Sequence, residues 1–186
     1  MSDATDQGGS GAPDGIDPET LRRISGLRTA LRENFGKVTM AMMMLPRYRS
    51  QMLGDLQHLV LDPMLQDRIA VAYAGAEPAP GQDMAGFAIW ASVSGEVDAA
   101  IREQIANGVF PVRLKPADWT SGKINWLLDV VAPDPATTAT VIGNFRKVAK
   151  EGELRLHPLI TRLVDAETLE KMGARRSPAP AGAGAT

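Results

Sequence analysis

The chain has 186 residues, 44% of them hydrophobic and 23% charged, which is enough for one globular domain with a substantial core. Its formal net charge of -2 argues against nucleic-acid binding through the electrostatics of the whole chain. It contains no cysteine, which excludes disulfides, thiolate metal ligands and a cysteine nucleophile. No apolar run reaches membrane-spanning length and the N-terminus has no secretion-signal pattern, so we expect a cytoplasmic protein without an integral membrane segment.

The two ends of the chain differ in composition from its middle. Residues 1–17 and 174–186 are rich in Gly, Ser, Ala and Pro and have little apolar surface to bury, so we expect two disordered tails. Residues 18–173 are then expected to form a single domain.

Two helical patterns open this domain. Residues 17–19 are typical of a helix start, with Asp before Pro and Glu. Apolar residues then recur every three or four positions from Leu21 to Phe35, which predicts an amphipathic helix that ends at Gly36. The Met-rich run 38–45 indicates either adaptable core packing or a groove for an acyl chain. A second helix is predicted from Met52 to Val60.

The stretch from Leu21 to Ser50 is strongly basic. It carries seven Lys and Arg residues against a single acid, Glu33. A solvated helix face would explain this charge, and so would a docking surface for an acidic partner.

Strand and helix patterns alternate along the rest of the domain. We expect strands at 69–74 and 86–94 that form a hairpin, a helix at 95–107, a strand at 126–131, a helix at 138–150, a strand at 153–160 and a helix at 165–172. This order predicts an α/β (α+β) fold with a mixed sheet.

Asp129 lies in the middle of the apolar run from Trp126 to Val131, which predicts a strand buried on both faces. A buried carboxylate costs several kcal/mol unless it is paired or hydrogen-bonded. Two interpretations follow: Asp129 is paired with an Arg or caps a loop, or it is functional. The run follows a turn, residues 118–122, in which we expect Gly122 to have a positive φ.

Other chemical motifs are absent from the sequence. His58 and His157 are the two histidines, and neither has a metal-ligand spacing, so no metal site is expected. The sequence has neither a Gly-rich phosphate-binding loop nor a G-x-S-x-G nucleophile motif.

Several segments resemble, in the same order, those of the toxin-activating lysine acyltransferases made beside RTX toxins. The most specific are Asp118-Trp119-Thr120-Ser121-Gly122, Trp126-Leu127-Leu128-Asp129 and Ala132-Pro133; weaker ones are 36–39, 46–49 and 85–92. The resemblance covers residues 36–172. It implies a fold like that of GNAT acyltransferases, with a mixed central sheet flanked by helices, and a homodimer.

This resemblance also implies an activity. Family members transfer a fatty acyl group from acyl carrier protein to internal lysines of an RTX protoxin, with no bound cofactor. Acyl carrier protein is acidic, so the basic stretch would dock it. The resemblance assigns Asp129 and Tyr48 to catalysis, and it assigns to substrate or partner binding Arg47, Arg49, Trp90, Ser92 and Trp119.

The sequence departs from the family at one position. The family's catalytic histidine lies in a P-x-H-R context, and here Tyr48 occupies its place. Tyrosine, with a pKa of about 10, is a poor base at neutral pH. His58 is expected to face elsewhere, because ten residues of α-helix rise about 15 Å and rotate about 280°. Three alternatives follow: Asp129 is the base and Tyr48 an oxyanion donor, another residue serves, or the chain binds its partners without catalysis.

Overall fold

The computed structural model describes residues 16–73, 83–149 and 153–163. By its contacts the chain divides into two compact units, one ending at Asn34 and the other starting at Phe35. Helix α1 (Pro18–Met43) contributes residues to both units. Its predicted start is confirmed, because Asp17 Oδ1 accepts hydrogen bonds from the backbone N–H groups of Glu19 (2.9 Å) and Thr20 (3.0 Å).

The predicted end of α1 at Gly36 is wrong, since the helix continues to Met43. Val38 and Met42, one helical turn apart, are 0% and 2% exposed in the core of the second unit. Their burial outweighs the low helix propensity of a single glycine. Most of the Met-rich run therefore belongs to the last turns of this helix.

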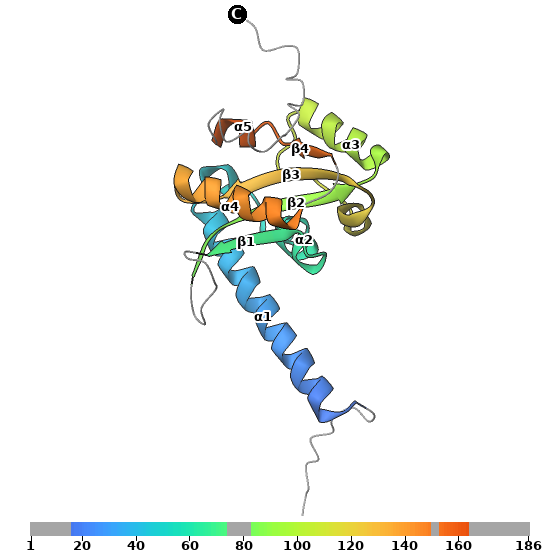
Figure 1. The fold of residues 1–186 in the computed structure, drawn as a ribbon, viewed down its shortest axis with the longest axis vertical. Helices are drawn as coiled ribbons and strands as arrows, with labels where there is room; N and C mark the ends of the chain where they lie inside the picture. Colours follow the sequence, from blue (N-terminus) through green and yellow to red (C-terminus); the bar gives the residue numbers. More distant parts are fainter. Residues whose placement is uncertain (1–15, 74–82, 150–152, 164–186) are drawn as a thin grey trace, which may run out of the picture. The chain divides into compact units, whose positions relative to one another are not determined.

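The second unit is built on the mixed four-stranded sheet shown in Figure 1, which confirms the predicted fold class. Its strands are β1 (Ile69–Tyr73), β2 (Met84–Val93), β3 (Ile124–Val131) and β4 (Leu154–Leu156), adjacent in that order. The first two strands form the predicted antiparallel hairpin. Strand β3 pairs antiparallel with β2 and parallel with β4, so it is an internal strand with paired neighbours on both sides.

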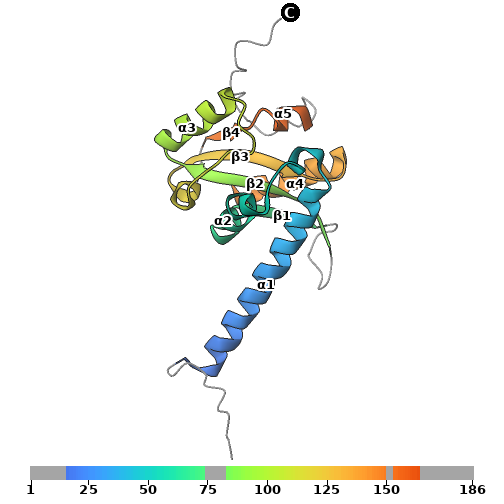
Figure 2. The ribbon, with the colours of Figure 1, turned by 180° about the vertical axis from the view of Figure 1, so that it is seen from behind.

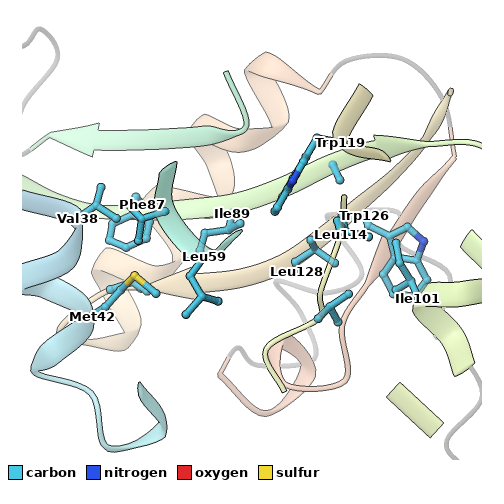
Figure 3. Close-up of a cluster of buried hydrophobic side chains, with 14 of the residues drawn as sticks. Val38, Met42, Leu59, Phe87, Ile89, Ile101, Leu114, Trp119, Trp126 and Leu128 are labelled. Atoms are coloured by element: carbon cyan, nitrogen blue, oxygen red, sulfur yellow. The ribbon is translucent and has the colours of Figure 1, made fainter. Parts of the chain in front are cut away.

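Each face of the sheet is covered by its own hydrophobic cluster. Helices α4 (Pro135–Val148) and α5 (Ile160–Leu163) supply residues to one cluster, and α4 crosses in front of the strands in Figure 1 and behind them in Figure 2. The opposite cluster receives residues from the end of α1, from helix α3 (Gly95–Ala106) and from the segment between α1 and β1. Figure 3 shows this second cluster, with Trp119, Trp126 and Phe87 among its largest side chains.

The second predicted helix, from Met52 to Val60, is wrong. The segment instead forms short 3-10 turns at Pro46–Tyr48 and Leu53–Asp55, a π-helical turn at Gln57–Leu61 and the short helix α2 (Asp62–Leu65). Met52 and Leu53 are 73% and 87% exposed, so the apolar spacing does not describe a buried face. Asp55 also accepts a hydrogen bond from the backbone N–H of Met52 (2.8 Å), which closes a local turn.

The remaining elements agree with the prediction except at their ends, apart from helix α5, which was not predicted. Helix α3 is confirmed, and α4 begins earlier than predicted because Asp134 caps it by accepting from the N–H of Thr137 at 2.8 Å. Strand β4 stops at Leu156, since the chain turns at Pro158 before α5 begins at Ile160. The predicted helix 165–172 and most of both predicted tails lie outside the described residues. Within the described residues, no helix is both long enough and apolar enough to cross a membrane.

Candidate active site

Asp129 points to the face of the sheet that is covered by the end of α1, residues 35–43, because of a register shift in β3. Ile89 of β2 pairs with Asp129, and the next β2 residue, Trp90, pairs with Leu127. Leu128 therefore has no β2 partner of its own, as in a β-bulge, and bulges often redirect side chains near active sites. Leu128 and Asp129 both border the same cavity as a result.

The Asp129 carboxylate accepts four hydrogen bonds from groups around it. Arg47 donates to both oxygens, from Nε to Oδ2 at 3.2 Å and from Nη2 to Oδ1 at 3.1 Å. The Tyr48 hydroxyl donates to Oδ2, and the backbone N–H of Val130 donates to Oδ1 at 2.7 Å. Arg47 Nη2 also donates to the Val130 carbonyl at 2.8 Å. A carboxylate has about four lone-pair positions, so all of them are used.

Burial sets the protonation states of this cluster. It raises the pKa of the Tyr48 hydroxyl well above its ordinary value, and the charge of Asp129 raises that pKa further. Burial also raises the pKa of the Asp129 carboxyl, against the opposing effect of the Arg47 charge and the hydrogen bonds. Every neighbour donates to the carboxyl, which favours its ionised form. Tyr48 is therefore a neutral hydrogen-bond donor at neutral pH.

A small cavity of about 20 Å³ adjoins this cluster. It is lined by Tyr48, His58, Leu59, Ile89, Phe110, Pro111, Val112, Trp119, Leu128 and Asp129; four of these, Leu59, Ile89, Trp119 and Leu128, are labelled in Figure 3. The expectation that His58 faces elsewhere is therefore wrong. It assumed one straight helix from Tyr48, whereas the chain turns twice between these residues and brings them to the same cavity.

An apolar groove of about 320 Å³ opens on the other side of Tyr48. We call it the methionine groove; its lining residues are Thr39, Met42, Met43, Tyr48, Arg49, Gln51, Met52, Leu53, Leu56 and Leu59. Met43, Met52 and Leu53 are each at least 68% exposed, so the groove presents apolar surface to solvent. Pockets of 300–1,000 Å³ are the usual size for small-molecule sites.

A second groove, of about 270 Å³, lies against Arg47. Its other lining residues are Ile105, Gly108, Val109, Phe110, His157, Pro158, Leu159 and Arg162. Arg47 and Tyr48 are adjacent in the chain and border different grooves, while both bond to Asp129. The cluster therefore borders two open grooves, one through Tyr48 and the other through Arg47.

The turn at residues 118–122 is held against the end of β2. Ser121 Oγ accepts from the N–H of Ser94 at 3.0 Å, and the N–H of Gly122 donates to the Ser92 carbonyl at 3.0 Å. The predicted positive φ at Gly122 is wrong: among the described glycines it occurs at Gly108. Gly122 is needed for close approach, because a Cβ there would collide with the backbone of Val93.

The other residues assigned to binding occupy different places. Trp119 is 2% exposed and borders the cavity beside Asp129. Arg49 is exposed at the methionine groove. Trp90 is in the cluster on the opposite face of the sheet, where its ring packs edge-on against Phe145 at 5.8 Å. Ser92 donates to Asn125 Oδ1 at 2.8 Å.

Sequence reasoning missed a second buried carboxylate, Asp98, which is 1% exposed. It accepts from Arg102 (2.6 Å), from Trp126 Nε1 (2.8 Å) and from Arg155. The four-residue spacing to Arg102 is a weak signal in the sequence, and the other two partners are distant in the chain. Asp98 lines neither of the two grooves nor the cavity beside Asp129.

No group of three or more His, Cys, Asp or Glu side chains in the described part of the chain is arranged to hold a metal ion. No curated protein matches the chain. The sequence model of the RTX toxin acyltransferase family matches residues 28–156, which is more than half of the 186 residues and includes the Asp129 cluster. The chain therefore belongs to the RTX toxin acyltransferase family, whose members are acyltransferases.

Proposed function

We propose that this protein transfers a fatty acyl group from acyl carrier protein to internal lysines of an RTX-type protoxin in the cytoplasm. The reacting centre is the cluster of Asp129, Tyr48 and Arg47. This proposal rests mainly on the position of that cluster. Tyr48 lines one open groove and Arg47 lines another, and both side chains bond to the buried Asp129 carboxylate.

The methionine groove supports a fatty acyl substrate. Methionine side chains are unbranched and flexible, so they adapt to an apolar chain without a fixed shape. Tyr48, whose hydroxyl bonds to Asp129, is one of the residues that line the groove. An acyl chain in this groove would lie against Tyr48, and through Tyr48 next to the Asp129 cluster.

The exposed arginines of the chain support an acidic protein as the acyl donor. Arg49 is exposed at the methionine groove in the second unit. In the first unit, Arg22, Arg23, Arg28 and Arg32 are exposed along α1. Exposed basic residues accelerate encounters with an acidic partner, and this effect weakens as salt is added.

One observation favours a second candidate function. Tyr48 takes the place of the family's histidine, and its raised pKa prevents it from acting as a base near neutral pH. A chain without a base would bind acyl carrier protein or an RTX protein without modifying it. This alternative predicts a stable complex and unmodified lysines.

The experiment is a transfer assay with purified chain, an RTX-type protein and acyl carrier protein carrying a radiolabelled acyl group. We expect label on the RTX-type protein with the wild type, and a loss of at least about 100-fold with Asp129→Asn, since the variant leaves Arg47 unpaired. Asp67→Asn is the matched control, because Asp67 is exposed and asparagine tolerates its φ of 55°. Full activity of Asp129→Asn would refute the proposed site, and binding without transfer by the wild type would favour the second candidate.

A further inference from the structure

We propose that His58 is the proton acceptor of the transfer reaction, supplied from a position ten residues beyond the one where the family carries its histidine. This inference rests on the proposed acyl transfer and deepens it. His58 would remove the proton from the attacking lysine, a role that we do not assign to Tyr48 or Asp129 because of their hydrogen bonds.

The Asp129 cluster has no free site for a proton. The carboxylate accepts four hydrogen bonds, two of them from the charged Arg47, and taking up a proton would break one of them. Tyr48 is already protonated and donates its hydrogen to Asp129. Because the hydrogen bonds of Asp129 are saturated and Tyr48 is protonated, we assign the base to a neighbouring group.

His58 is the group that the structure provides. It borders the same cavity of about 20 Å³ as Tyr48 and Asp129. Its Nε2 is buried, and none of the described residues forms a hydrogen bond with it. A buried polar atom without a partner is costly and is rare unless it has a functional reason. The cavity is large enough for one water molecule, which needs about 10–15 Å³, and such a water would relay the proton to His58.

The surroundings of His58 keep it neutral. Burial lowers the pKa of its imidazole and the positive charge of Arg113 lowers it further, while Asp55 and Asp62 act in the opposite direction. Arg113 and Asp55 are themselves paired at 3.8 Å, which reduces the net effect of both charges. At pH 7 the imidazole therefore has a free lone pair, as a general base requires.

With His58 as the base, the bonds and protons of the transfer reaction are accounted for as follows. The neutral lysine amine attacks the thioester carbon, and a C–N bond forms as the carbonyl electrons move to oxygen. His58 takes one proton from the nitrogen through the intervening water. The tetrahedral intermediate then collapses, the C–S bond breaks, and the imidazolium returns the proton to the departing thiolate. The products are an amide on the lysine and the free thiol of the acyl carrier protein.

His58→Gln tests the inference in the transfer assay, as a function of pH. A general base contributes about 100-fold to 10,000-fold, so we expect the maximal rate to fall by at least about 100-fold while KM changes little. The rate should fall with pH in every variant because the lysine amine becomes protonated, but in the wild type it should fall more steeply below the pKa of His58, and His58→Gln should lack this extra decline. Gln57→Ala is the matched control, because Gln57 is exposed beside His58 and lines neither groove nor the cavity; it should leave the pH dependence unchanged.

A second measurement keeps the test valid if the substitution disturbs folding. In the wild-type chain, histidine-selective NMR should show an imidazole that titrates below 6.5, disappears in His58→Gln and shifts in Asp129→Asn. An unchanged rate and pH decline in folded His58→Gln would overturn the inference and leave the proposed function intact. A wild-type chain that binds its partners without transfer would overturn both.

Discussion

At the scale of single residues, Arg47 is the charge partner that allows Asp129 to be buried. The sequence showed that Asp129 would lie in a buried strand, and it left open whether the carboxylate is paired or functional. The ion pair with Arg47, at 3.1 Å, confirms the paired interpretation and is compatible with the functional one. Its partner could not be identified from the sequence, because 82 residues separate the two side chains.

Arg47→Met should destabilise the protein strongly. It leaves the Asp129 charge buried without its partner, which typically costs about 3–5 kcal/mol in the free energy of unfolding. Arg49→Met is the matched control, because Arg49 is exposed and such substitutions change stability by about 0.5 kcal/mol or less. Urea denaturation of both variants measures the difference, and equal stabilities would contradict the role given to Arg47.

Tyr48→Phe should have a smaller effect on stability. The ring remains in place beside Phe110, with ring centres 5.7 Å apart, and only the hydrogen bond to Asp129 is lost. Removing one donor from a buried charged acceptor costs about 1–3 kcal/mol. Denaturation measures this loss, and a variant as stable as the wild type would show that the Tyr48 hydroxyl does not support the carboxylate.

At the scale of elements, the sequence predicted the sheet and most helices well because their apolar spacing matches their burial. It failed between α1 and β1, where the spacing from Met52 to Val60 indicated a helix that the chain does not form. Spacing alone cannot distinguish apolar residues that enter the core from those that line an open groove. This error also hid His58, because its place beside Asp129 depends on the two turns that replace the predicted helix.

Gly122→Ala should destabilise the turn that carries the family's most specific residues. The added methyl group would collide with the backbone of Val93, and overpacking of this kind costs about 1–3 kcal/mol. Gly143→Ala is the matched control, because this glycine lies in α4 with nothing within 4 Å of an added Cβ. Alanine should stabilise that helix by about 0.5–1 kcal/mol. Thermal unfolding that shifts both variants in the same direction would contradict this account.

At the scale of the whole molecule, His157 should make stability depend on pH. Burial lowers its pKa to about 4, whereas an unfolded histidine titrates at about 6.5. Between these values the unfolded chain binds more protons than the folded one, so stability decreases as the pH falls from about 6.5 to about 4. His157→Gln removes this contribution. Denaturation at about pH 7 and about pH 4.5 should show a smaller loss in the variant than in the wild type.

Mass spectrometry of the protein substrate tests most directly whether the whole protein acylates internal lysines. An RTX-type protein from the same organism is expressed alone, with the wild-type chain, and with Asp129→Asn. The account predicts a fatty acyl adduct on an internal lysine that appears only with the wild-type chain. Unmodified lysines in a preparation where the two proteins form a complex would contradict it, and would indicate a binding protein that has lost its catalytic activity.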